Sequence, residues 1–348
     1  MKKISAIIIP ALLLLPVLPS AKDVPPVDEY TNTITADWSW RKAKNVLIVG
    51  AGDSLRVIAP YGGRSDKGKA YADVVNRYKQ VLGEGVNVYC MLVPTSTEFY
   101  CPDSARYLTR SEAAYFNSLH GFLADSVRVV DCYSVLSHHV EEPIYSRTDH
   151  HWAPLGAFYA ARELAMAAGV PFYDLEEYEV VSIPGYVGSM YSFSGSREVL
   201  NSPEDFVYFV PHFVEYTTTY TVYNMDKANK YVVSKNAPQK GQFFFKFKSG
   251  SRAMYCTFMG GDTKLTKVET SVPGGRKLLI LKDSFGNAVP GYLLGSFSEV
   301  HVVDCRYYPD NIAKYIKANG ITDVAFVNNT VHASSSAVIS NYNKYLDR

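Results

Sequence analysis

Residues 277–287 of this chain read KLLILKDSFGN. The run at 277–281 is short and apolar, as in a buried strand, and an Asp-Ser turn followed by glycine ends it. This is the shape of a strand that delivers a serine to the top of a sheet. In open α/β sheets, ligands bind beyond the carboxyl ends of the strands, which makes Ser284 a candidate nucleophile. Backbone amides near Gly286 and Asn287, at the start of a helical turn, are candidates for stabilising an oxyanion.

Strand-like and helical runs alternate on both sides of a middle region that has a different composition. Apolar strand-like runs occupy residues 46–49, 86–93, 127–130, 277–281, 299–303 and 324–327, and helical patterns occupy 70–82, 111–123, 154–168, 287–294, 312–318 and 335–346. This alternation predicts an α/β fold in which helices cover both faces of a mostly parallel sheet. Residues 172–275 are rich in Gly, Ser, Thr and Tyr, with alternation at 213–217 and 243–247, and predict a β-rich insertion. We therefore expect an α/β domain in two parts, 41–171 and 276–348.

The N-terminus predicts export. Two lysines precede an apolar stretch at 4–18, and a Pro-Ser-Ala exit follows it. This pattern describes a secretory signal peptide, because a membrane-spanning helix needs about 20 apolar residues. We expect residues 1–21 to be the signal peptide and residues 22–40 to be a linker. The mature protein is then periplasmic, extracellular or attached to the cell surface.

Composition narrows the classes of partner. The 348 residues contain 35 Lys and Arg against 34 Asp and Glu, and a net charge of +1 creates no field that would attract nucleic acid. We therefore expect no nucleic-acid partner. The 27 tyrosines suit stacking on sugar rings, and they are equally common in β-rich secreted proteins.

No spacing in the sequence is typical of a metal or redox site. The five cysteines show no C-x-x-C pair, and Cys90, Cys132 and Cys305 lie in or beside apolar runs, as buried thiols do. Two histidines and two glutamates at residues 138–142 precede a proline and are expected to be solvated. They form no standard zinc spacing with later histidines. We therefore predict no metal, no cofactor and no particular disulfide.

Residues 149–152 read DHHW and lie directly before the predicted helix at 154–168, where the chain is expected to pass from a strand to a helix. An Asp-His pair can orient an imidazole that takes a proton from a serine, and it can also bind a metal. The turn at Ser284 favours the catalytic interpretation. His150 is then expected to be a core or capping histidine, and Trp152 is either a packing residue or a platform for a sugar. Both are also candidates for contacting a substrate.

A competing serine lies in residues 52–55, which read GDSL and spell the nucleophile block of the GDSL hydrolases. The residues that follow form another apolar run, so that 46–49 and 55–58 indicate a β-hairpin. A nucleophile elbow leads into a helix instead. Ser284 is therefore favoured over Ser54.

Residues 145–152, YSRTDHHW, with the Gly-Ala pair and Ala-rich helix that follow, resemble the bacterial DHHW proteins. They also resemble the Asp-x-His-Trp segment of the periplasmic alginate O-acetyltransferases, a group that is similar to SGNH hydrolases. Residues 93–95 (VPT) and 283–288 (DSFGNA) match as well, so that the resemblance covers about residues 40–170 and 275–348. It implies a three-layer, SGNH-hydrolase-like α/β fold.

The resemblance also implies a Ser-His-Asp triad. Ser284 would be the nucleophile, His151 the general base and Asp149 the residue that orients His151. Asp149 and His151 are two positions apart, whereas the corresponding residues of the hydrolase block are three positions apart. This difference leaves His150 as an alternative partner of Asp149.

The sequence block that carries the oxyanion-hole asparagine of the hydrolases does not occur here in its usual form. Asn287, Asn328 and Asn329 remain candidates for its role.

The activity implied is that of an exported carbohydrate O-acetyltransferase or acetyl esterase, which acts through an acyl-enzyme on a cell-envelope or extracellular polysaccharide. A transferase of this kind would take its acetyl group from a membrane-bound partner. The main alternative is a non-catalytic cell-envelope protein that binds glycans in the same cleft. A metal-dependent hydrolase is a third hypothesis.

Overall fold

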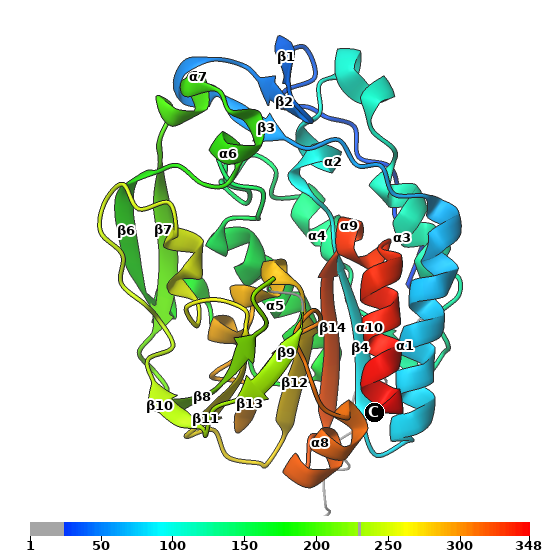
Figure 1. The fold of residues 1–348 in the computed structure, drawn as a ribbon. Helices are drawn as coiled ribbons and strands as arrows, with labels where there is room; N and C mark the ends of the chain where they lie inside the picture. Colours follow the sequence, from blue (N-terminus) through cyan, green and yellow to red (C-terminus); the bar gives the residue numbers. More distant parts are fainter. Residues whose placement is uncertain (1–23, 229–230) are drawn as a thin grey trace, which may run out of the picture.

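A computed structural model describes residues 24–228 and 231–348, so the predicted signal peptide at 1–21 lies outside the described residues. The described chain forms an α/β fold around a mixed, largely parallel central sheet (Figure 1), which confirms the predicted fold class. None of the helices in these ranges is both long and apolar enough to cross a membrane.

The central sheet runs in the order β10-β8-β11-β13-β12-β14-β4-β5, with β9 paired to β8. Its strands are β4 (Asn87–Val93), β5 (Val127–Val129), β8 (Tyr216–Met225), β9 (Val232–Lys235), β10 (Gln239–Gly241), β11 (Lys264–Thr270), β12 (Lys277–Lys282), β13 (Glu299–Asp304) and β14 (Asp323–Asn329). Neighbours from β13 to β5 are parallel, and those from β10 to β13 are antiparallel. Strand β13, which follows β12 in the chain, pairs with one edge of β12, and β14 pairs with the other edge. Such a switch point is where open α/β sheets bind ligands.

The larger helices cover the central sheet and match the predicted helical patterns, and short helices lie in the connections between strands. The helices are α1 (Gly68–Leu82), α2 (Ser96–Tyr100), α3 (Glu112–His120), α4 (Cys132–Ser137), α5 (Pro154–Ala168), α6 (Met190–Ser194), α7 (Arg197–Leu200), α8 (Ile312–Asn319), α9 (Thr330–Ala333) and α10 (Ser336–Asp347). Helix α5 begins at a proline, which needs no amide partner there, and ends at Gly169 with φ 65°, a conformation that glycine adopts readily.

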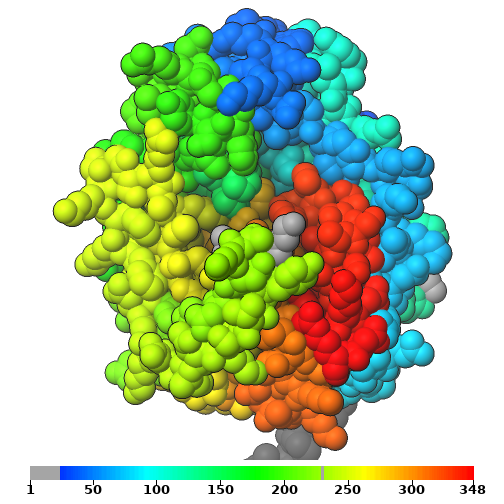
Figure 2. All heavy atoms as spheres, in the orientation of Figure 1, coloured from blue at the N-terminus to red at the C-terminus, as the bar shows by residue number. Residues whose placement is uncertain are grey.

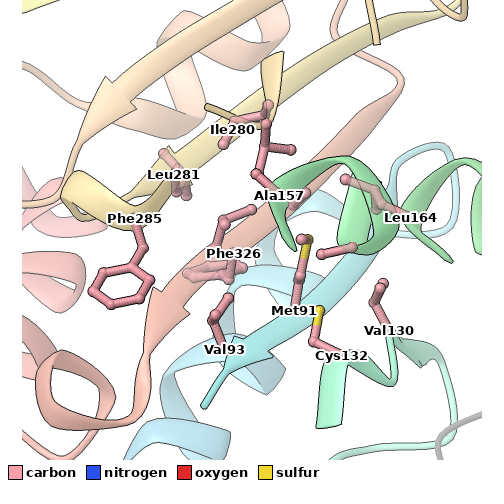
Figure 3. Close-up of a cluster of buried hydrophobic side chains, with 14 of the residues drawn as sticks. Met91, Val93, Val130, Cys132, Ala157, Leu164, Ile280, Leu281, Phe285 and Phe326 are labelled. Atoms are coloured by element: carbon pink, nitrogen blue, oxygen red, sulfur yellow. The ribbon is translucent and has the colours of Figure 1, made fainter. Parts of the chain in front are cut away.

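The core lies between the sheet and these helices. Phe326 of β14 contacts the rings of Tyr78 in α1 and Tyr342 in α10, with centroids 4.9 and 5.1 Å apart. Figure 3 shows another part of the same cluster, in which Ala157 of α5 lies with Met91 of the sheet. Small side chains on α5 let its backbone approach the strands closely, as its Ala-rich face predicts.

Two of the runs predicted in the α/β alternation differ from the structure. The run at 46–49 is a strand, β2 (Val46–Val49), but it belongs to a separate antiparallel sheet with β1 (Trp40–Ala43) and β3 (Arg56–Ile58), which includes the predicted hairpin. The helix predicted at 287–294 is replaced by 3-10 turns, because Pro290 has no amide to continue a helical ladder.

The middle region is rich in strands, but it is not a separate layer. Its β6 (Tyr178–Tyr186) and β7 (Glu204–Pro211) form a separate two-stranded antiparallel sheet, whereas β8, β10 and β11 extend the central sheet. The predicted alternation at 243–247 makes no strand, and only an isolated bridge joins Phe244 to Phe258.

The predicted linker at 22–40 packs against the domain over its described part. Val27 is buried, and the side-chain amide of Asn117 bonds its backbone N–H and C=O at 2.8 and 2.9 Å. Asn32 donates to the carbonyl oxygen of Cys101 at 2.9 Å. Polar side chains thus anchor this segment to the domain.

All five cysteines fall within the described residues, and each is free. Cys90, Cys132 and Cys305 are buried, as their apolar neighbours predict, and burial raises the pKa of the Cys90 thiol to about 12.

The close approach of α5 to the backbone of Ile144 gives a test of the fold. A Cβ atom at Gly156 would lie 2.4 Å from the carbonyl oxygen of Ile144. We expect Gly156→Ala to lower the free energy of unfolding by about 1–3 kcal/mol, measured by urea denaturation, because that backbone has to move. Gly85 has open space around its Cβ position, so Gly85→Ala is the control and should change stability by less than about 0.5 kcal/mol. Equal effects in the two variants would contradict this packing.

Candidate active site

Ser284 lies just beyond β12, at the switch point of the sheet. Buried Asp283 fixes the turn, because its Oδ1 accepts from the Phe285 amide at 2.8 Å and its Oδ2 from the Asn329 amide at 2.8 Å. These bonds tie the end of β12 to the end of β14. Asp283 thus caps the turn that presents the serine.

Asp149 and His151 do not follow a strand of the sheet, contrary to the prediction of a strand-to-helix crossing. They lie in a loop between α4 and α5 that folds back on itself, with an isolated bridge between Tyr145 and Trp152. The loop brings both side chains over the end of β12.

A hydrogen-bonded chain joins Ser284, His151 and Asp149. Nε2 of His151 lies 2.8 Å from Ser284 Oγ, and Nδ1 of His151 lies 2.6 Å from Asp149 Oδ1. Asp149 Oδ2 also accepts from the Ser189 amide at 2.7 Å. Because an ionised carboxylate only accepts, Nδ1 carries the proton in the neutral ring, and Nε2 can then accept the hydroxyl proton of Ser284.

Asp149 is held in its ionised form. Burial by itself would raise the pKa of its carboxyl group, but the charge of His151, the hydrogen bond to that ring, the charge of His150 and the Ser189 amide hold it well below its usual range. The carboxylate therefore remains an acceptor across the pH range in which a histidine titrates.

His150 is not part of this chain of bonds. Its Nδ1 lies 2.5 Å from Ser189 Oγ and 3.7 Å from Asp149 Oδ1. Burial, followed by the charge of the adjacent His151, lowers the pKa of His150 to about 4. The geometry thus selects His151, and not His150, as the partner of Ser284.

Aromatic side chains hold the imidazole in place. The ring of Tyr255 stacks on His151 with centroids 3.8 Å apart and 6° between planes. Trp152 is fully buried and donates from Nε1 to the carbonyl oxygen of Phe285 at 2.9 Å. Trp152 therefore packs beneath the site and offers no face to a sugar, because its ring is covered. Tyr255, from the middle region, has no sequence pattern that would have marked it.

Glu204, which begins β7 in the middle region, holds the loop that carries Asp149. Its carboxylate accepts from Ser146 Oγ at 2.5 Å, from the amides of Arg147 and Thr148 at 2.9 and 2.8 Å, and from the Thr148 hydroxyl at 2.6 Å. Ser146 Oγ in turn accepts from the Asp149 amide at 3.1 Å. A single glutamate with no fixed spacing to the DHHW residues gave no signal in the sequence.

The two predicted oxyanion donors nearest to the serine are engaged. The Gly286 amide donates to the Asp283 carbonyl at 3.0 Å, and Asn287 Nδ2 donates to Asp262 Oδ1 at 2.9 Å. A Cβ atom at Gly286 would lie 2.5 Å from Cβ of Lys282, so that this glycine is needed for packing of the turn. Asn287 Oδ1 is buried and has no partner within the described chain, which leaves it as an acceptor beside the serine.

The other asparagine candidates follow β14. Asn328 is buried, and its Oδ1 accepts from two tyrosine hydroxyls at 2.5 and 2.8 Å, which makes it a structural residue. Asn329 Nδ2 lies 3.0 Å from His332 Nδ1. The amide of Ser284 begins its 3-10 turn, where the first amides have no acceptor within the turn itself, which makes it a further candidate for the oxyanion donor.

An open pocket of about 280 Å³ leads to Ser284. Ser189, Arg252 and Asp262 also line it, and the Arg252 guanidinium lies 4.4 Å from the ring centroid of Tyr191. Figure 2 shows the surface hollowed between the green upper segment, the yellow segment and the red C-terminal part. An open pocket with charged and hydroxyl side chains in its wall can admit a substrate that carries hydroxyl groups.

Asp149, His150 and His151 have potential metal ligand atoms within 4.8 Å of one another. However, both ring nitrogens of His151 bond Asp149 and Ser284, and His150 Nδ1 bonds Ser189. Hydrogen bonds thus account for the cluster, and the absence of a metal stays a prediction.

The competing Ser54 lies apart from these groups. It is exposed in the 3-10 turn Gly52–Ser54, between β2 and β3 of the small sheet. The structure therefore does not bring Ser54 to His151.

Comparisons with known proteins agree with the resemblance seen in the sequence. The profile of the family described as DHHW protein matches residues 31–303. A DHHW family protein from Eubacterium siraeum has a similar crystal structure, with 36% sequence identity and a TM-score of 0.78, over 88% of this chain and 97% of that chain. No curated protein matches the chain.

More distant likenesses concern the fold alone. The structure of Bacillus cereus PatB1 with a sulfonyl adduct shares 18% identity and a TM-score of 0.63, over 85% of this chain and 99% of that chain. The O-acetyltransferase domain of Pseudomonas putida AlgJ shares 14% identity and a TM-score of 0.43, over 88% of this chain and 99% of that chain.

The family match runs through the middle region, so the similarity is wider than the two flanking parts predicted from sequence motifs. A family profile that spans most of the chain and a solved structure that is 36% identical lead to one assignment. This chain belongs to the DHHW protein family.

Proposed function

We propose that this protein is a serine-dependent carbohydrate O-acetyltransferase or acetyl esterase. The observation that carries the proposal is the bond chain in which His151 lies 2.8 Å from Ser284 Oγ and 2.6 Å from Asp149 Oδ1. Nucleophile, base and orienting carboxylate then stand in the order that acyl transfer requires.

The reaction follows from these contacts. Ser284 Oγ attacks the acetyl carbonyl carbon while His151 Nε2 takes its proton, and the oxyanion that forms is stabilised by the Ser284 amide. Collapse expels the first alcohol, which receives the proton from His151, and leaves acetyl-Ser284. A second hydroxyl, from a sugar or from water, then attacks the acetyl carbonyl carbon and passes its proton to His151. The bond from that carbon to Ser284 Oγ breaks, and Ser284 Oγ takes the proton back from His151. The acetyl group is thereby transferred to the sugar or to water. Which of the two reacts depends on how well water is excluded from the pocket.

Two further observations support this proposal. PatB1, which shares the fold, was obtained with a sulfonyl adduct, and sulfonyl reagents react with activated hydroxyl groups. The pocket beside Ser284 is open and offers charged and hydroxyl side chains, such as Arg252, Asp262 and Ser189, to the hydroxyl groups of a glycan. We further propose that the N-terminal sequence directs export, that the substrate is a cell-envelope or extracellular polysaccharide, and that a transferase would receive acetyl from a membrane-bound partner.

One observation favours the alternative of a non-catalytic glycan-binding protein. The side-chain amides of Asn287 and Asn329, and the backbone amide of Gly286, are already hydrogen-bonded within the chain. An oxyanion would then depend on the Ser284 amide or on a rearrangement of these groups.

Substitution of the serine separates the two hypotheses. We expect Ser284→Ala to lower kcat for hydrolysis of p-nitrophenyl acetate by at least ~10³-fold, because no other group forms the acyl-enzyme. Ser54→Ala is the matched control and should keep full activity, and addition of EDTA should have no effect. Loss of turnover in Ser54→Ala with full activity in Ser284→Ala would mean that the other serine is the nucleophile.

The two histidines provide a second test. We expect His151→Ala to lower kcat by at least ~10³-fold and Asp149→Asn by a similar factor, because both changes remove the oriented base. His150→Ala should lower kcat by less than ~10-fold, since His150 touches neither Ser284 nor the Nδ1 proton of His151. Steady-state kinetics with the same ester measures all three. The opposite order for His150 and His151 would refute the assignment of the base.

A further inference from the structure

A second and larger cavity lies in the middle region, away from Ser284. Its volume is about 680 Å³, and it is formed by the two-stranded sheet of β6 and β7, strands β8 and β10, and the segment at 242–247. No residue that lines the pocket at Ser284 lines this one as well. We name it the aromatic pocket, after Tyr208, Tyr216, Phe243, Phe244 and Phe247 in its wall.

The aromatic rings form flat apolar surfaces. The rings of Tyr208 and Phe244 are nearly parallel, at 19°, with centroids 6.1 Å apart, and Phe243 packs against Phe244 at 4.9 Å. Tyr208 and Phe243 are buried as a floor, whereas Phe244 and Phe247 are only half-buried. Exposed ring faces of this kind match the apolar C–H face of a sugar ring.

A buried hydroxyl in the wall lacks a partner. Thr218 of β8 is 3% exposed and lines the aromatic pocket, and its Oγ1 has no hydrogen-bond partner within the described chain. Buried polar groups are nearly always hydrogen-bonded, so an unpartnered one in a cavity wall points to a group that enters from outside. A ligand hydroxyl can both donate to and accept from it.

Polar side chains of both signs surround the rings. Glu179, Lys240, Gln242 and Lys246 line the same cavity, and all four are exposed. Sugar hydroxyls pair with donors and acceptors alike, whereas an acyl chain makes no hydrogen bond to these groups. The combination of rings, a free hydroxyl and mixed charges therefore favours a saccharide over a lipid.

The aromatic pocket is connected to the triad by a row of rings. Phe244 contacts Phe258 with centroids 6.0 Å apart, Phe258 contacts Tyr255 at 6.0 Å, and Tyr255 stacks on His151 at 3.8 Å. Phe258 is fully buried, so this row joins the two sites through the core.

We propose that the aromatic pocket is a carbohydrate-binding subsite, which holds a segment of polysaccharide distant from the acetyl group that reacts at Ser284. The inference rests on the proposed function for the identity of the reacting group. It names the substrate class as an oligomer rather than a single sugar, because a cavity of about 680 Å³ is larger than one sugar ring.

Binding is measured on the full chain carrying Ser284→Ala, so that no turnover occurs. The probes are cellotetraose, chitotetraose and tetragalacturonate with their monosaccharides, by isothermal titration calorimetry. We expect at least one tetrasaccharide to bind, and its monosaccharide to bind at least ~10-fold more weakly. Phe247→Ala and Thr218→Val should each raise Kd for the tetrasaccharide by ~10-fold or more. Tyr107→Ala, at an aromatic residue that is 76% exposed outside the pocket, is the control and should bind as before.

Activity distinguishes failure of this inference from failure of the proposed function. With Ser284 restored, Phe247→Ala should leave hydrolysis of p-nitrophenyl acetate unchanged and raise KM for an acetylated form of the tetrasaccharide that binds. Tetrasaccharide binding without ester hydrolysis would refute the proposed function and keep the subsite. Lack of binding by all three probes, binding that Phe247→Ala and Thr218→Val leave intact, or binding of the apolar dye anilinonaphthalene sulfonate alone would overturn the subsite.

Discussion

The hydrogen bond between His151 and the buried carboxylate of Asp149 is the contact on which the site depends. A buried carboxylate is costly unless hydrogen bonds replace its water, and Asp149 obtains them from His151 and from the Ser189 amide. In return it fixes the ring so that Nε2 faces Ser284. Ser189, Glu204 and Tyr255 all come from the middle region. That region therefore completes the site, in addition to widening the sheet.

Much of the α/β architecture could be predicted from the sequence because its signals are local. The apolar run before Ser284 becomes the buried strand β12, and Pro154 and Gly169 bound helix α5 as their backbone preferences require. The apolar run and the turn that follows it also predict that Ser284 lies beyond the end of a strand. The geometry then brings it to Asp149 and His151, which lie more than 130 positions earlier in the chain and were singled out as a short polar cluster.

What the sequence left open depends on contacts between distant segments. The choice between His150 and His151 follows from Ser189, whose hydroxyl engages His150 and whose amide bonds Asp149. Burial of Trp152 depends on its hydrogen bond to the Phe285 carbonyl oxygen, and Phe285 has no fixed spacing to the tryptophan in the sequence. Glu204 is the clearest case, because one carboxylate organises the loop before Asp149 without any neighbouring motif.

The central claim is that Ser284 carries the acetyl group during the reaction. Brief incubation with p-nitrophenyl acetate, an acid quench and mass spectrometry of the peptide that contains β12 and its turn test it directly. We predict one added acetyl group on Ser284, which disappears when the reagent is removed and which His151→Ala does not accumulate. An acetyl group on another residue, or turnover of the ester while Ser284 stays unmodified at every quench time, would contradict this account.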